Sequence, residues 1–173
     1  MNIEFCIHRD VTPKDPIGHV IDAWTRTVSG GPWILAEGPA THAFLAVDGF
    51  RLDAAPPLTR WHLDTPAQPP RPEARWTIDL DPLQTARLLR AAGLEDGQPY
   101  DLGEIVQQAI TPVLSQMGRA VGLPKGRICT TTVMACMKAA EHPVLNALMA
   151  DMANHAPESL GRAMERHALK RTR

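Results

Sequence analysis

The chain has 173 residues, of which 44% are hydrophobic and 21% are charged, and its formal net charge at pH 7 is −1. This length and composition suit one soluble domain, so we treat residues 1–173 as a single domain in which 143–173 is a C-terminal helical extension. Because positive and negative residues are interspersed, no strong basic field exists for a nucleic-acid backbone, and we expect no nucleic-acid partner.

The sequence carries no signal for a membrane or an export route. It lacks a run of about eighteen apolar residues, and its first residues lack the basic and apolar regions of a secretion signal. We therefore expect a cytoplasmic protein without an integral membrane segment, although export by another route stays open. The three cysteines are an odd number, which favours reduced thiols over a disulfide framework.

The first part of the chain predicts a strand, a helix and a second short strand. Residues 3–7 are β-prone, and Asp15-Pro16 is a helix-opening pair of cap and proline. Apolar residues then recur at helical spacing until Gly30-Gly31 ends the helix. A brief strand at 33–35 leads into the most informative stretch of the sequence.

That stretch is two apolar runs, 41–47 and 50–54, joined by Asp48-Gly49. Asp-Gly between apolar runs is the strongest short-range signal for a β-hairpin. With this turn, cross-strand partners sum to 97, so Phe44 faces Asp53 and His42 lies diagonally from Asp53 on the same face. A histidine oriented by a carboxylate is the base of a nucleophilic triad. The alternative is a strand-initial histidine near an exposed aspartate.

Residues 54–75 contain six prolines, which exclude helix interiors and central strands. We interpret this stretch as an extended loop on the surface or around a sheet edge, with Trp61 and His62 inside it. Loops of this length often belong to binding sites. A tryptophan in a loop also commonly anchors the loop to the core.

The rest of the chain is predicted to be mostly helical. A strand at 76–80 precedes a helix that Asp81-Pro82 opens and Gly93 ends. After a turn at 97–100, Asp101 caps a further helix, and a largely apolar helix begins at or near Cys129. Further helices begin at Pro143 and Pro157, and we expect the basic residues 169–173 to be frayed.

Cys129 is the strongest candidate nucleophile because it lies at a helix N-terminus. The positive end of the helix dipole and a nearby imidazolium both lower a thiol pKa, and His42 could supply the imidazolium. Backbone amides of the same first turn, around Thr130, could hold an oxyanion. Cys136 and Cys6 lie in apolar surroundings and are predicted to be small core residues.

Four short motifs occur in an order that resembles one known family. They are Thr41-His42, Leu52-Asp53-Ala54, Gly97-Gln98-Pro99-Tyr100-Asp101 and Ile128-Cys129-Thr130, and they span about residues 15–140 with their flanking elements. The order resembles the circularly permuted branch of the papain-like, NlpC-type cysteine peptidases and amidases, the YiiX-like group, which is related to lecithin retinol acyltransferase.

The resemblance implies a triad of Cys129 as nucleophile, His42 as base and Asp53 as the orienting acid. The third residue is often glutamate in this group, so the aspartate is a departure from the pattern. Tyr100 has the position of a tyrosine near the site, with a role as oxyanion or substrate donor or in packing. The expected fold is α+β, with a small antiparallel sheet that carries His42 and Asp53 and packs against the Cys129 helix.

The leading hypothesis is thiol-dependent hydrolysis of an amide, with a bacterial or phage cell-wall peptide as the substrate class and no cofactor. One alternative is an acyltransferase or thioesterase on a lipid-like substrate, with the proline-rich loop and Trp61 as an apolar lid. Another is a catalytically silent binding module on the same fold. We expect no metal site, since the sequence has neither a C-x-x-C nor an H-x-x-x-H pair. The oligomeric state stays open.

Overall fold

The computed structural model describes residues 1–9, 19, 40–65, 73–101, 103, 128–152, 155–167 and 169–172. Within these residues the protein is α+β and contains six strands and four helices. The strands are β1 (Ile3–Arg9), β2 (Ala40–Val47), β3 (Phe50–Ala55), β4 (Leu58–Leu63), β5 (Glu73–Thr77) and β6 (Lys170–Arg171). The helices are α2 (Pro82–Glu95), α4 (Cys129–Ala139), α5 (Pro143–Ala150) and α6 (Pro157–Arg166). The predictions for 15–31 and 33–35 and most of the helix after Asp101 lie outside the described residues.

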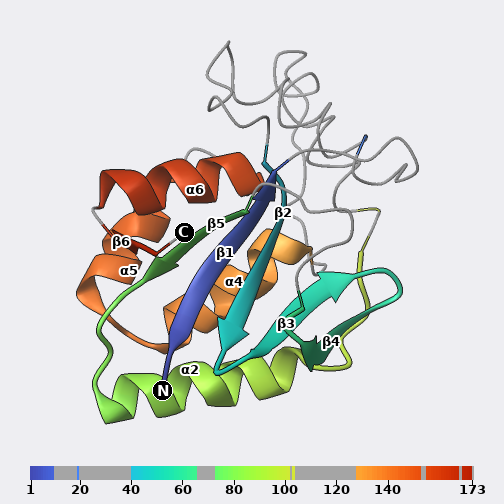
Figure 1. The fold of residues 1–173 in the computed structure, drawn as a ribbon, viewed down its shortest axis with the longest axis horizontal. Helices are drawn as coiled ribbons and strands as arrows, with labels where there is room; N and C mark the ends of the chain where they lie inside the picture. The colour runs from blue at the N-terminus through green and yellow to red at the C-terminus, as the bar shows by residue number, and fades with distance from the viewer. Residues whose placement is uncertain are drawn as a thin grey trace, which may run out of the picture.

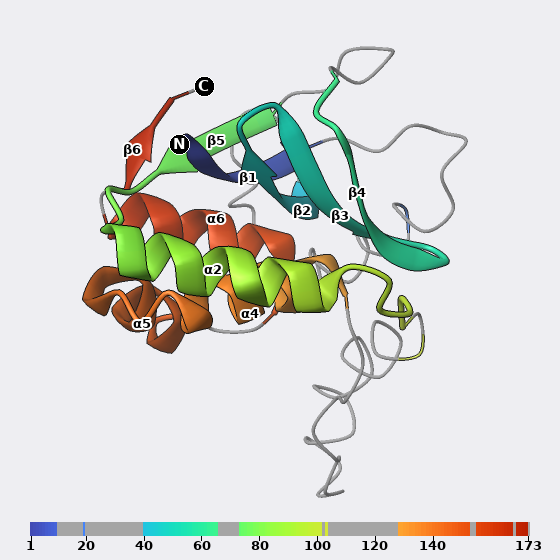
Figure 2. The same cartoon turned by 90° about the horizontal axis from the view of Figure 1, so that it is seen from below.

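All strands pair antiparallel in one sheet with the order β4-β3-β2-β1-β5-β6, as Figure 1 shows. The four labelled helices form a second layer along one face of this sheet (Figure 2). The first strand of the chain therefore lies in the middle of the sheet.

The core lies between these two layers because the strands alternate in apolar character. On β1 and β2 every second residue enters the main core, and on β5 Ala74 and Trp76 do so, both with 0% exposure. The helices contribute buried residues such as Leu88, Met137 and Leu160. On the opposite, outer face of the sheet a small apolar cluster of Cys6, Phe44 and Ala46 lies among polar and charged side chains.

The predicted hairpin is confirmed, including its register. Val47 pairs with Phe50 and Phe44 pairs with Asp53. Asp48 and Gly49 adopt positive φ angles of 46° and 84°, as a type I′ turn requires. The register expected from the turn therefore places His42 and Asp53 on the same, outer face of the sheet.

Helices α2, α4, α5 and α6 confirm the predicted helical segments near their predicted starts. Asp81 caps α2 by accepting a hydrogen bond from the Gln84 backbone N–H, and the Gln84 side chain accepts one from the Asp81 N–H. Gly93 does not end this helix, which continues to Glu95, and Glu95 is itself buried.

Two expectations about irregular segments are wrong. The stretch 54–75 is not one extended loop: it contains the end of β3, all of β4 and the start of β5. Pro56 and Pro57 form the turn between β3 and β4, so they leave the ladder of Leu58–Leu63 free to form. Residues 169–172 are not frayed, because Lys170 and Arg171 pair with Thr77 and Trp76 as β6.

Candidate active site

Helix α4 presents Cys129 as its first residue. Ile128 caps the helix in an extended conformation, and the Thr131 hydroxyl bonds both the N–H (2.9 Å) and the C=O (3.1 Å) of Ile128. Val133, Cys136 and Met137 bury the other end of the same helix in the core. The apolar packing of α4 thus fixes the position of a thiol at the helix N-terminus, where unpaired N–H groups and the helix dipole favour negative charge.

His42 and Asp53 are in direct contact, as the diagonal pairing predicts. The His42 Nε2 atom lies 2.5 Å from Asp53 Oδ1, and the two side chains are only 19% and 13% exposed. The Cys129 thiol also interacts with the His42 side chain, by hydrogen bonding and by charge.

The pKa of the Cys129 thiol is lowered despite burial, which by itself would raise it. The hydrogen bond and positive charge of His42 are the main causes, and the backbone N–H of Ala43 and the hydroxyl of Thr130 also favour the thiolate. By contrast, burial raises the pKa of Cys6. The structure therefore distinguishes Cys129 electrostatically from another buried cysteine of the same chain.

The His42 pKa is raised to about 10, although burial opposes its charge, because Asp53 and the Cys129 thiolate both favour the imidazolium. The same contacts, led by the charge of His42, hold the pKa of Asp53 well below its usual range against the opposing effect of burial. The shifts of all three pKa values thus favour the thiolate of Cys129, the imidazolium of His42 and the carboxylate of Asp53. This arrangement can perform nucleophilic attack followed by proton transfer.

Two side chains hold the second oxygen of Asp53, and sequence reasoning missed both roles. Asp53 Oδ2 lies 3.5 Å from an Arg51 nitrogen and 3.3 Å from His62 Nε2, and the same His62 nitrogen lies 3.2 Å from Arg51 Nε. The signal was available in part, since Arg51 lies two residues from Asp53 on one strand and therefore shares its face. Placing His62 required the β4 ladder, which the proline count had obscured.

A second histidine–carboxylate pair lies beside the first. His8 is the direct cross-strand partner of His42, with ring centroids 6.1 Å apart. Its Nε2 atom lies 2.6 Å from Glu73 Oε2 on β5, and both side chains are nearly buried. Burial lowers the His8 pKa, and the charge of His42 lowers it further, although Glu73 opposes the shift. His8 therefore stays neutral beside the charged His42.

Phe44 forms an apolar floor under this outer face of the sheet. Its ring meets His8 edge-on at 4.9 Å and lies near-parallel to the His42 ring at 6.3 Å. Guanidinium groups cover it from two sides, Arg51 at 5.2 Å and Arg75 at 5.7 Å from the ring centroid. These contacts leave Phe44 0% exposed although it faces away from the main core.

The remaining predicted residues have separate outcomes. Thr130 is fully buried beside the thiol, with its hydroxyl 3.9 Å from Cys129 Sγ. Tyr100 lies at the turn between β3 and β4, where its backbone N–H bonds the Pro57 carbonyl at 3.0 Å. Trp61 is a correction: it lies in β4 opposite Leu52 and packs against the main core, so it is on the face away from Asp53 and is no lid on a loop.

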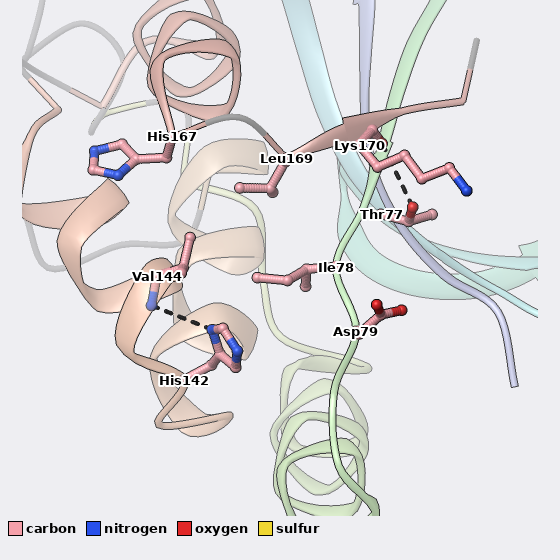
Figure 3. Close-up of a pocket in the computed structure, with 8 residues that line it drawn as sticks. All are labelled: Thr77, Ile78, Asp79, His142, Val144, His167, Leu169 and Lys170. Carbon is pink, nitrogen blue, oxygen red and sulfur yellow. Dashed lines mark hydrogen bonds between the residues drawn. The ribbon is translucent and has the colours of Figure 1, made fainter.

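A pocket of about 340 Å³ lies elsewhere in the fold, between the ends of β5, α5, α6 and β6 (Figure 3). His142 and Val144, which line it, follow the C-terminal end of α4, whereas Cys129 begins that helix. An 11-residue helix is about 16 Å long, so this pocket is distinct from the Cys–His–Asp site.

Two other features do not occur among the described residues. No group of three or more His, Cys, Asp or Glu side chains is arranged to hold a metal ion there. In the same part of the chain, no helix is both long enough and apolar enough to cross a bilayer.

Comparisons with known proteins return nothing: no protein-family model, no curated protein and no solved structure matches this chain significantly.

Proposed function

We propose that the protein is a cysteine-dependent hydrolase of amide bonds, a peptidase or amidase. The observation that carries the proposal is the alignment of a helix-terminal thiol of lowered pKa with an imidazole that a carboxylate contacts at 2.5 Å. Three residues distant in sequence meet in the order nucleophile, base and orienting acid, which is the functional arrangement of cysteine hydrolases. The proposed fold is permuted and papain-like, and the proposed substrate class is a bacterial cell-wall peptide, both by family resemblance.

In the proposed reaction, the Cys129 thiolate attacks the amide carbonyl carbon and forms a C–S bond while the carbonyl π electrons move to oxygen. Backbone N–H groups of the first turn of α4 stabilise that oxyanion. His42 donates its proton to the leaving nitrogen as the C–N bond breaks. Neutral His42 then removes a proton from water, whose oxygen attacks the thioester, and the C–S bond breaks to restore the thiolate and the imidazolium.

Selective alkylation of Cys129 tests the proposal directly. We expect iodoacetamide at pH 6.5 to label Cys129 in the folded chain, because its thiolate persists below the usual thiol pKa of about 8.5. Cys129→Ala should lose this labelling and any amide hydrolysis. Cys136→Ala is the matched control, since Cys136 is a 0% exposed residue of the same helix, and it should keep both. Peptide mapping by mass spectrometry locates the adduct.

The labelling rate also measures access, since Cys129 is only 2% exposed and a reagent reaches its sulfur only when the site opens. Equal labelling of the parent and the Cys129→Ala variant would contradict the proposal. A Cys129 that reacts only above pH 8.5 would instead support a catalytically silent binding module.

A further inference from the structure

The outer face of β3 and β4, beside Asp53, carries a group of basic side chains. Arg51 faces His62 and Asp53 faces Arg60 across the two strands, and directly paired residues share a face of the sheet. Arg51, Arg60 and His62 therefore surround the carboxylate that orients His42. We call these three residues the basic rim.

The members of the basic rim differ in their partners. Arg51 and His62 contact each other and Asp53 Oδ2. Arg60 is exposed, and within the described ranges of the chain it has no hydrogen-bond or ion-pair partner. Its directly paired neighbour Asp53 is already held by His42 at 2.5 Å and by His62 at 3.3 Å. Arg60 thus presents a positive charge to solvent next to the triad.

Among the described residues, the other carboxylates on this face do not neutralise Arg60. Glu4, Asp64 and Glu73 all contact Arg75, which lies on β5 on the far side of β1 and β2. Asp53 balances one of the two arginines of the rim, so the rim keeps an excess of positive charge when the thiolate and imidazolium cancel each other. The outer face therefore carries two charged groups: a cluster in which Arg75 is paired with carboxylates, and the basic rim beside the triad, in which Arg60 is exposed to solvent.

We propose that the basic rim is a subsite for a carboxylate of an acidic peptide, with Arg60 as the residue that binds it. This inference rests on the proposed hydrolase function and names its substrate class. Arg60 on β4 lies two strands from His42 on β2, which is roughly 10 Å at about 4.8 Å per strand and corresponds to about three peptide residues at roughly 3.3–3.6 Å per residue. A single open guanidinium suits one carboxylate, whereas a nucleic acid would need several phosphate contacts, which a chain of net charge −1 does not supply.

Matched alkylating peptides test the subsite on the full chain. The probes are iodoacetyl-glycyl-glutamate amide and its glutamine counterpart, together with the pair that places the acidic residue one position further. The measured quantity is the ratio of the second-order rate constants for Cys129 with the acidic and the neutral probe, at low salt. Because the two probes share one reactive group, changes in sulfur nucleophilicity cancel in the ratio.

We expect the parent ratio to be roughly threefold or more above one for at least one probe pair, because a single charge pair near the surface has an effect of this size. Arg60→Glu should lower the ratio to one or below, and Arg60→Gln should lower it to an intermediate value. Arg60→Lys keeps the positive charge and should retain most of the parent ratio. Lys170→Glu is the matched control, since it makes the same change of charge on β6, the opposite edge of the sheet, and should leave the ratio unchanged.

The outcomes separate this inference from the proposed function. A Cys129 that plain iodoacetamide does not label would contradict the hydrolase. A reactive Cys129 with a parent ratio near one for both pairs, or an equal decrease with Lys170→Glu, would overturn the subsite and leave the hydrolase standing. Protection of Cys129 by a single-stranded oligonucleotide at physiological salt, without peptide discrimination, would replace the acidic peptide with a nucleic acid.

Discussion

Asp53 has contacts on both carboxylate oxygens, and this fixes its orientation. Oδ1 meets His42 at 2.5 Å, while Oδ2 meets His62 at 3.3 Å and Arg51 at 3.5 Å. A carboxylate held on both sides stays ionised and cannot rotate away from the imidazole. The shorter side chain of aspartate, a departure from the glutamate common in the resembled family, is therefore no obstacle to the proposed role of Asp53.

Asp53→Asn tests this role by removing the charge that favours the His42 imidazolium. We expect the His42 pKa to fall from its raised value of about 10 and the Cys129 pKa to rise, since each group stabilises the charge of the other. At pH 6.5 the alkylation rate of Cys129 should decrease about tenfold or more, with a smaller decrease at pH 9.5. The pH profile of iodoacetamide labelling measures both effects.

A matched control for that profile is Asp151→Asn. Asp151 is an exposed carboxylate that pairs with Arg166 at the end of α6, and this variant should reproduce the parent profile. A parent-like profile for Asp53→Asn would remove Asp53 from the site.

At the scale of elements, the hairpin was predictable in detail because its two-residue turn fixes how the residues of the two strands pair. Asp48-Gly49 sets the register, and alternation then sets which residues share a face, so the His42–Asp53 contact followed from sequence. Strand β4 escaped prediction because the prolines cluster around it, although Leu58–Leu63 itself contains none. A proline excludes a strand only where its own position would have to donate a backbone hydrogen bond to the neighbouring strand.

Family resemblance suggested the contact between Cys129 and His42, whereas local sequence pattern could not predict it. The contact depends on how α4 packs across β2, a long-range arrangement that periodicity does not encode. The second pair, His8 with Glu73, depends likewise on β5 pairing with β1 across 65 residues of sequence. Local rules therefore predicted the parts of the site, and tertiary packing determined how they meet.

Glu158 connects helix α6 to the start of β2. This glutamate is 2% exposed in the first turn of α6, where it accepts hydrogen bonds from Arg9 at 2.9 Å and from the Ala40 backbone N–H at 3.1 Å. Ala40 is two residues before His42. The position of the proposed base is thus linked to a helix more than a hundred residues later in the chain.

We expect Glu158→Gln to lower the free energy of unfolding by about 3 kcal/mol, because it removes the negative charge from the buried ion pair between Glu158 and Arg9. Labelling of Cys129 in the still-folded fraction should also slow as the start of β2 loosens. Denaturant unfolding measures the first effect. Glu165→Gln, which changes an exposed residue of the same helix, should remain within about 0.5 kcal/mol of the parent. An equal effect of both substitutions would refute the linkage.

At the scale of the whole molecule, the His42–Asp53 pair makes stability depend on pH. The folded-state pKa of His42 is raised, so its contribution is complete below its unfolded value of about 6.5 and is lost as pH rises toward 10. The folded-state pKa of Asp53 is lowered, so its contribution is complete above about pH 4 and is lost in acid. The two windows overlap between about pH 4 and 6.5.

We therefore expect Asp53→Asn to destabilise most in that overlap, by about 3 kcal/mol, and progressively less as pH rises. Both chains should carry Cys129→Ala, so that titration of the thiol does not contribute. Urea unfolding at pH 5.5, 7.5 and 9.5 gives the comparison. A difference that grows with pH would contradict the assigned ionisation of the pair.

The two ends of the described chain lie close together. Strands β1 and β6 flank β5, and the Thr172 hydroxyl donates to Glu4 at 3.2 Å across 168 positions of sequence. A short linker could therefore join these ends, and new termini could open at an exposed turn elsewhere while the strand order of the sheet is retained. In such a rearranged chain the three reactive groups would keep their places in space while their order along the polypeptide changed. The proposed chemistry therefore depends on where these side chains lie in the folded protein and not on their order along the sequence.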